Sequence, residues 1–330
     1  MTIRCLYVGL PTGRLTDTES ESETRSHNKK VDSINKSGYG FQRKIALEIS
    51  STEKWDVEIE KPLVRFEERS VEEVKVDILA RSRRKFSDMP RAVSVIECKR
   101  HDPKYSEWLF FSRGSNLGEI EGREKFPSVW CHLTGGSYSF DNKHHKTGRM
   151  GMYEGYFPSL AEWADIKYSD SFGVPTRRDG TIGAADSGVI QHAANQVARG
   201  VLGAVHSLHE YRNSRRKERF LPLTGNHLVL PVLVTTAPIY VCHVDDAATD
   251  LLQGSIPPDG LETESKKCLL FRYSLPIGLW FPPDTLAGDG LPDLTSLSVW
   301  VVSSSFCKEF FSLVDKDAAH WQEMAPIQGQ

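Results

Sequence analysis

Two carboxylates and a lysine stand out in this sequence because they interrupt or end hydrophobic segments. Asp77 lies within the run VKVDILA, and Glu97 and Lys99 lie at the end of the run AVSVIECKR. Side chains two residues apart on a strand point to the same face, and an acid on a neighbouring strand can meet them there. We therefore expect Asp77, Glu97 and Lys99 to converge at one edge of a sheet.

Such a cluster is unfavourable unless it binds something. Charged groups at the end of a hydrophobic strand lose solvation, and two nearby carboxylates repel each other. Mg²⁺, or Mn²⁺ in its place, would relieve both effects, with Asp77, Glu97 and the main-chain carbonyl of Cys98 as oxygen ligands beside water and a phosphate oxygen. The metal would act as a Lewis acid, and Lys99 would orient or deprotonate the attacking water. This arrangement predicts metal-dependent phosphodiester hydrolysis.

The segments around these residues predict a helix followed by three strands. From Gly38, the run GYGFQRKIALEIS places Phe41, Ile45 and Ile49 four residues apart, which forms one helical stripe of about three turns. The runs WDVEIEKPLV, EVKVDILARS and AVSVIECKR then carry β-branched residues with a period of two. The second and third of these strands would hold the charged residues.

The runs GYGFQRK, WDVEIE, VDILARS and VIECKR together resemble the PD-(D/E)XK nuclease superfamily, and most closely its Mrr-like branch. The resemblance implies an α/β, restriction-endonuclease-like core in which helices flank a central mixed sheet. It also implies Asp77, Glu97 and Lys99 as the catalytic set. The expected activity is Mg²⁺-dependent endonucleolytic cleavage of DNA, with RNA as an alternative substrate and bacterial defence as the most natural setting.

Two further positions matter for this resemblance. Family members often carry a glutamate directly after the phenylalanine of the first helix, but Gln42 occupies that position here and Glu48 lies further along. Many members also place a glutamine on the helix after Glu-x-Lys, for which Gln191 and Gln196 both qualify. We take Gln196 as the catalytic candidate, although the sequence leaves open which of the four completes the site.

A second helix is predicted within residues 184–212, where apolar residues recur at every fourth position. Asp186 or Ser187 can cap its start. Its three glycines, Gly188, Gly200 and Gly203, would weaken a free helix, so we expect close packing on a sheet to compensate.

The later segments predict further strands and one more helix. After the basic run RNSRRKER, expected to be a loop, LVLPVLVTTAPIYVCHV predicts one or two core strands divided near Pro238. The run SLSVWVVSS predicts a strand, and SFCKEFFSLV predicts a helix with Ser303 to Ser305 as candidate caps. Alternating strands and helices favour a mixed or parallel sheet covered on both faces.

These patterns suggest a short arm followed by one nuclease-like domain. Residues 1–37 form the N-terminal arm and a segment expected to be flexible, because residues 11–37 contain no aromatic residue and few large aliphatic ones. The nuclease-like domain spans residues 38–330. Its core covers about residues 38–100 and 186–244, with an insertion at about 101–185 and a C-terminal extension at about 245–330.

Basic residues near the predicted site could contact nucleic acid. The run RSRRK lies just beyond the strand of Asp77, and Arg100 follows Lys99. The alternative is an ordinary solvated loop, which also holds for the run RNSRRKER at 212–219. The candidate contacts are Arg81, Arg83, Arg84, Lys85 and Arg100.

Other chemistry-bearing groups are better explained as structural. The pairs His144–His145, His206–His209, Cys131–His132 and Cys242–His243 lack further ligands nearby in the sequence. Aromatic residues at 108, 110, 111, 130, 138 and 140 could stack on bases, but core packing is their expected use. The sequence has no P-loop, GxGxxG or GxSxG motif, which removes the usual markers of nucleotide hydrolysis, dinucleotide redox chemistry and serine hydrolysis.

Composition sets the remaining expectations. The chain has 330 residues and a formal net charge of −3, so nucleic acid must be attracted by local patches rather than by a global field. No apolar run reaches the ~20 residues of a membrane helix, and six scattered cysteines indicate reduced thiols, so we expect a cytoplasmic protein without membrane contact. A homo-oligomer or a regulatory partner is compatible with the sequence. The alternative function is a catalytically inactive nuclease-fold module that binds nucleic acid or protein.

Overall fold

The computed structural model describes most of the chain. The described residues are 17–66, 71–83, 92–101, 106–112, 129–133, 138–140, 143–145, 150–154, 158–160, 167–175, 181–218, 225–245, 255–276 and 296–324. The chain divides into two compact units, residues 1–40 and residues 41–330. Within the described ranges, none of the helices combines the length and the apolar character that crossing a membrane requires.

The first unit contains helix α1 (Asp17–Lys36), in the segment that we expected to be flexible. Regular secondary structure was not part of the expectation for this segment. The helix contains neither glycine nor proline, and four of its five acidic residues precede its lysines, an order that favours the helix dipole. Val31 and Ile34 are exposed, so local propensity rather than a buried core accounts for the helix.

The predicted order of one helix and three strands is confirmed. Helix α2 (Tyr39–Ser50) is followed by β1 (Trp55–Phe66), β2 (Val71–Ser82) and β3 (Ala92–Lys99). Helix α2 buries Ile45 and Ile49 of the predicted stripe, together with Ala46, and Phe41 of the stripe is half-buried. The periodicity of the sequence was sufficient to predict the type and order of these four elements.

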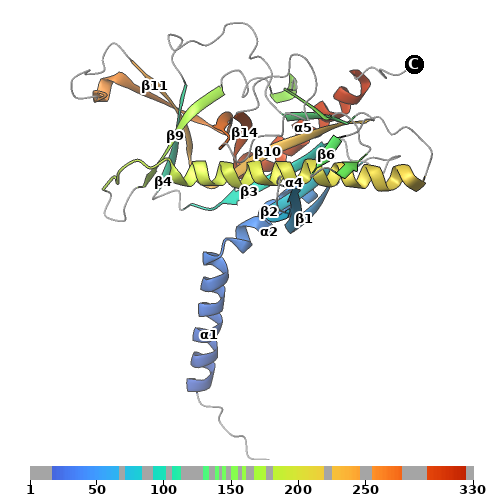
Figure 1. Ribbon diagram of the computed structural model, residues 1–330. Coiled ribbons are helices and arrows are strands. Elements are labelled where there is room, and N and C mark those ends of the chain that lie inside the picture. Colours follow the sequence, from blue (N-terminus) through green and yellow to red (C-terminus); the bar gives the residue numbers. More distant parts are fainter. Residues whose placement is uncertain are drawn as a thin grey trace, which may run out of the picture. The chain divides into compact units, whose positions relative to one another are not determined.

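The remaining described elements are mostly strands, with the longer helices α4 and α5 among them (Figure 1). They are β4 (Ser106–Ser112), β5 (Val129–Leu133), β6 (Tyr138–Phe140), β7 (Lys143–His145), β8 (Met150–Glu154), η1 (Pro158–Leu160), β9 (Lys167–Pro175), α4 (Gly188–Glu218), β10 (Gly225–Thr235), β11 (Ile239–Val244), η2 (Pro258–Gly260), β12 (Leu261–Lys266), β13 (Cys268–Ser274), β14 (Ser296–Ser303), η5 (Ser304–Phe306) and α5 (Cys307–Met324).

The strands form a mixed sheet in two portions. Its order is β1-β2-β3-β10-β14-β13-β9-β4-β11-β12. In addition, β5 pairs with β10, and β8 pairs with β5. One portion has six strands, β1, β2, β3, β10, β14 and β13, and the other has four, β9, β4, β11 and β12. Among the described residues, β13 and β9 join the two portions through two pairs, Leu270 with Lys167 and Phe271 with Tyr168. The predicted mixed α/β sheet is confirmed. The expected insertion and C-terminal extension both add strands to it, and β14 lies next to β10 in the middle of the six-stranded portion.

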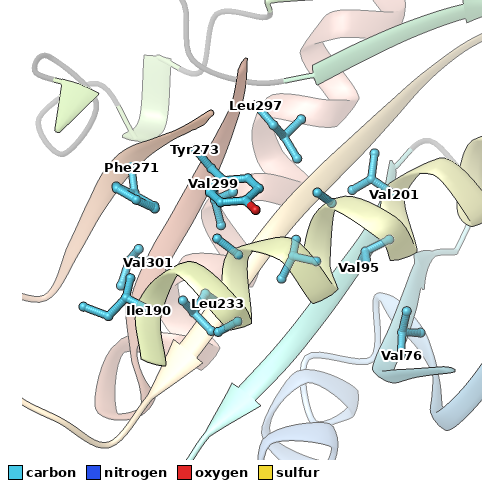
Figure 2. Packing of buried hydrophobic residues seen from close by; sticks show 14 of the residues in the cluster. Val76, Val95, Ile190, Val201, Leu233, Phe271, Tyr273, Leu297, Val299 and Val301 are labelled. Atoms are coloured by element: carbon cyan, nitrogen blue, oxygen red, sulfur yellow. The ribbon is translucent and has the colours of Figure 1, made fainter. Parts of the chain in front are cut away.

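Apolar side chains cover both faces of the sheet, as predicted. On one face, α4 packs Ile190, Val197 and Val201 against strand residues (Figure 2). On the other face, residues of α2 and α5, including Ile45 and Phe311, join a second cluster. The sheet is therefore held between helices.

Helix α4 is longer than the sequence pattern indicated. Asp186 Oδ1 accepts a hydrogen bond from the Gly188 backbone N–H (2.8 Å), which confirms the predicted cap. A Cβ on Gly200 would lie 2.5 Å from Val76 Cγ1 and 2.6 Å from Val95 Cγ1, which confirms that this glycine permits close packing on the sheet. The helix includes most of RNSRRKER, so the loop expected there is wrong, because no glycine or proline between Ala204 and Glu218 stops the helix.

The later strands follow the prediction with one local difference. Strands β10 and β11 are separate and flank Pro238, and β14 precedes α5 as expected. A 3₁₀ turn, η5, lies between β14 and α5. Ser303 occupies the N-cap position of this turn but makes no capping hydrogen bond through its side chain.

Candidate functional site

The hairpin of β1 and β2 changes direction at Glu60 and Asp77. The two strands pair on both sides of this point, but the pair that Glu60 and Asp77 would form is missing. Glu60 has a φ of 53°, in the left-handed region that few residues other than glycine adopt. Ile78 belongs to the cluster under α2, whereas Val76 belongs to the cluster under α4, so β2 changes face between them.

This bend opens a fork between β2 and β3. The two strands pair from Ile78 to Arg81 and from Val93 to Ile96, and continuing that antiparallel register would place Asp77 opposite Glu97. The pairing ends instead at Ile78, and the charged residues lie just beyond it. We call Asp77, Glu97, Cys98 and Lys99 the fork residues.

Two N–H donors hold the carboxylate of Asp77. Gln42 Nε2, from α2, donates to Asp77 Oδ1 (2.7 Å), and the Cys98 backbone N–H donates to Asp77 Oδ2 (2.8 Å). Burial raises the pKa of Asp77, while the Cys98 N–H and the charge of Lys99 oppose this shift. The carboxylate is therefore fixed in position from both β3 and α2.

Glu97 and Lys99 project toward α4, as their spacing predicts. Val93 and Val95, at the preceding alternate positions of β3, belong to the cluster that α4 covers. Lys99 Nζ donates to Glu97 Oε1 (2.7 Å) and to Gln196 Oε1 (2.9 Å). The structure thus brings Gln196, rather than Gln191, to the predicted catalytic residues.

The buried carboxylates make this edge of the sheet electrostatically unusual. Glu97 is only 5% exposed. Its burial and the nearby charge of Asp77 raise the pKa of Glu97 to about 7, although Lys99 opposes the shift. Perturbed carboxylates of this kind cluster at functional sites, but structural ion pairs produce them as well.

The fork residues offer a donor set that fits a divalent cation bound through oxygen. The Thr236 N–H donates to the Lys99 carbonyl on the β10 side, so the alternation of the ladder turns the main-chain groups of Cys98 toward β2 and Asp77. Within the described ranges, no group of three or more His, Cys, Asp or Glu side chains could hold a metal ion. A cation here would be held by the carboxylates of Asp77 and Glu97, neutral oxygens and water, which suits Mg²⁺.

The structure does not bring Arg81 or Arg83 to the fork. Arg81 forms an ion pair with Glu58 of β1, and Arg83 Nε lies 2.7 Å from Asp56 Oδ1. Arg81 is four residues beyond Asp77, or about 13 Å along an extended strand. Their predicted contact with nucleic acid stays a prediction, as does that of Arg100, which is exposed beside Lys99. Arg84 and Lys85 lie outside the described residues.

The structure also bears on the predictions made for the cysteines, the aromatic residues and the histidine pairs. Cys98, Cys242, Cys268 and Cys307 are free and buried, which confirms the interpretation for these four. Trp108 and Phe110 are buried in the core, as expected. The described side chains do not include those of the His144–His145, His206–His209 and Cys131–His132 pairs, nor those of Trp130, Tyr138 and Phe140.

Two residues near the fork were not singled out from the sequence. Glu60 contributes negative charge that raises the pKa of Asp77, and no sequence pattern identifies a glutamate with a left-handed backbone. His101 donates its backbone N–H to Thr236 Oγ1 (2.7 Å), and its ring packs edge to face on Trp108. Burial, and then the charge of Lys99, lower the pKa of His101. His101 lies two residues after Lys99 in the sequence, and this spacing was the signal that could have identified it as a neighbour of the fork.

Comparisons of the chain with family models, with curated proteins and with solved structures found no match. The function is therefore inferred from the geometry of the fork and from the sequence motifs that form it.

Proposed function

We propose that this chain is a Mg²⁺-dependent endonuclease that hydrolyses DNA phosphodiester bonds and that its core is restriction-endonuclease-like. The observation that carries the proposal is the convergence of Asp77, Glu97, Lys99 and Gln196 from β2, β3 and α4. Asp77, the pair Glu97 and Lys99, and Gln196 lie far apart in the sequence, and the sequence motifs alone single them out. The order α2, β1, β2, β3, α4 and β10 also agrees with the order that the family resemblance implies.

Each fork residue has a distinct part in the proposed reaction. Asp77, Glu97 and the Cys98 carbonyl would hold the cation, which when bound supplies Lewis acidity and lowers the pKa of a bound water. The hydrogen bonds from Gln42 and Cys98 keep Asp77 in one orientation, so its carboxylate needs little rearrangement to bind. Pre-organisation of this kind lowers the free-energy cost of assembling the site.

Lys99 would act directly on the reacting phosphate or on the attacking water. Its ammonium group has three N–H donors, and Glu97 and Gln196 accept from two of them in the described structure. The third donor remains available for a phosphate oxygen or a water molecule. A positioned positive charge stabilises the negative charge that develops as the phosphorus–oxygen bond is attacked.

The test is cleavage of supercoiled plasmid, single-stranded DNA and RNA by the full chain, with Mg²⁺ or Mn²⁺ and with EDTA. We expect wild type and an Asp56→Asn control to cleave DNA with metal, because Asp56 pairs with Arg83 away from the fork. Asp77→Asn should lose cleavage while remaining folded, because the amide keeps an acceptor oxygen but loses the ligand charge.

Two results would contradict the proposal. Cleavage by Asp77→Asn at the wild-type rate would show that the fork is not the catalytic site. Binding of nucleic acid without cleavage of any substrate, in either metal, would favour the catalytically inactive binding module instead.

A further inference from the structure

Gln42 is a half-buried residue that contacts the fork from α2. It lies on the same helix as the buried residues Ile45, Ala46 and Ile49. Its side chain reaches Asp77, where Nε2 donates to Oδ1 over 2.7 Å. The position is thus fixed both by the helix and by a charge-assisted hydrogen bond.

The orientation of the Gln42 amide follows from that contact. Exchanging the nitrogen and the oxygen would place Gln42 Oε1 against the carboxylate oxygen of Asp77, and neither atom can donate. Gln42 Oε1 is therefore the outward end of the amide. This oxygen is buried and has no hydrogen-bond partner among the described residues. A buried acceptor without a partner is unfavourable, which calls for an explanation at this position.

The surroundings of this oxygen favour a cation. The same amide already contacts the carboxylate of Asp77, which when ionised can only accept hydrogen bonds, and the charge of Asp77 acts on Glu97. Each carboxylate oxygen has room for two partners, so the bonds from Gln42 and Cys98 leave Asp77 able to bind a metal. A divalent cation would satisfy the carboxylates and the amide oxygen together, and amide oxygens are ordinary ligands of hard cations.

We propose that Gln42 Oε1 is a direct ligand of the cation at the fork, beside Asp77, Glu97 and the carbonyl of Cys98. The protein ligands then comprise two carboxylates and two neutral oxygens, a set that suits one divalent cation. The inference rests on the proposed metal-dependent function, and it adds that this chain holds a single metal ion.

The test measures metal binding without nucleic acid, in the full chain. Mn²⁺ titration followed by electron paramagnetic resonance gives stoichiometry and affinity, and Tb³⁺ luminescence lifetimes in H₂O and D₂O count the waters on a bound ion. We expect wild type to bind one Mn²⁺ per chain. Gln42→Leu should bind Mn²⁺ about 10-fold more weakly or worse, with one additional water on Tb³⁺.

Two variants separate a ligand from a residue that only orients Asp77. Gln42→Glu keeps an oxygen ligand but loses the N–H donor and adds repulsion toward Asp77. We expect it to bind Mn²⁺ at least as tightly as wild type, with no additional water on Tb³⁺. Gln191→Leu, on α4 and without contact to the fork, should match wild type in both measurements. Thermal unfolding checks that each variant is folded.

The outcomes that overturn the inference are distinct from failure of the proposed function. Wild-type affinity and water count in Gln42→Leu, or weaker binding by Gln42→Glu, would show that Gln42 is not a ligand. Two Mn²⁺ ions bound at the fork of wild type would exclude the single-metal site. If wild type binds no Mn²⁺, the metal-dependent function fails together with the inference. If Gln42→Leu does not fold, the affinity and water count of Gln42→Glu decide.

Discussion

Strands β3 and β10 are parallel neighbours that end at the same edge of the sheet, and their ends differ in chemistry. Glu97 lies beside Leu233 and Lys99 lies beside Thr235 in the paired register. The end of β10 is apolar except for hydroxyl groups, and Leu233 and Thr235 are fully buried. The end of β3 carries two charges in the same layer of the fold.

The polar groups at the end of β10 are satisfied by the adjacent chain. Thr235 Oγ1 accepts from the Ala237 N–H (3.0 Å), and Thr236 bonds to the backbone of His101. The charges on β3 instead depend on side chains from β2, α2 and α4. Since β10 shows that this edge can end without charge, the fold alone does not require Glu97 and Lys99, and the unfavourable burial of Glu97 indicates a function.

The largest expected effect is the loss of DNA cleavage when Lys99 is replaced. Lys99→Ala should lower the single-turnover rate of DNA cleavage by about 10²–10³-fold, because it removes a charge that acts in the transition state. Lys99→Arg should not restore the rate fully, because a planar guanidinium differs from an ammonium in geometry and does not release a proton near neutral pH. DNA affinity, measured in Ca²⁺, should change only a few fold.

The neighbouring strand supplies the control for Lys99. Thr235→Ala should lower stability but leave the rate unchanged, since Thr235 bonds only to the local backbone. Equal rate losses at both strand ends would remove the functional distinction between them. Loss of affinity in Lys99→Ala that Lys99→Arg restores would indicate a binding module.

A second prediction concerns the pH dependence of stability at Glu97. Its pKa is about 7 in the folded chain against 4.5 as the reference, so the folded state binds more protons between these values and loses stability as the pH rises through them. Glu97→Gln cannot ionise and avoids this loss. In EDTA, urea unfolding should show the variant close to wild type at pH 4.5 and more stable by about 3 kcal/mol at pH 8.

Glu58, on β1, provides a control of opposite sign. Burial raises the pKa of Glu58, but the hydrogen bonds and charges of Lys61 and Arg81 outweigh it and lower the pKa overall. Its ionised form therefore stabilises the fold above its unfolded pKa, and this contribution is lost as the pH falls. Glu58→Gln should be less stable than wild type at pH 8 and approach it in acid. A parallel response of the two variants would contradict the assignment.

A third prediction tests how α4 reaches β3. Gly200→Ala places a methyl group against Val76 and Val95, and overpacking of this kind costs about 1–3 kcal/mol of unfolding free energy. It should also lower the cleavage rate, because moving α4 away from β3 separates Gln196 from Lys99. Gln191→Ala, on the same helix, should change neither quantity measurably. Unaltered stability in Gly200→Ala would refute the close packing.

The smallest expected effect is on the salt dependence of DNA binding, in which we expect Arg100 and Arg83 to differ. Arg100 follows Lys99 at the end of β3, whereas Arg83 pairs with Asp56. Arg100→Ala should reduce the slope of log K against log salt by about 0.9 for duplex DNA, as expected for one phosphate contact. Arg83→Ala should reduce the slope less, because the ion pair with Asp56 offsets its charge. Equal slopes for the two variants would remove the distinction.

The sequence by itself determined the local elements of the site. The stripe of Phe41, Ile45 and Ile49 predicted α2, and β-branched alternation predicted β1, β2 and β3. The period of two placed Glu97 and Lys99 on one face, because successive side chains of a strand alternate between faces. These are short-range properties that neighbouring residues fix among themselves.

Only the tertiary structure decided which distant groups meet these residues. Gln191 and Gln196 are equivalent candidates in the sequence, and the depth at which Gly200 lets α4 approach β3 places Gln196 beside Lys99. The bend at Glu60 and the position of β14 beside β10 likewise have no local pattern. Such pairings depend on how whole faces of the sheet and helices pack together, so no short window of sequence contains the information.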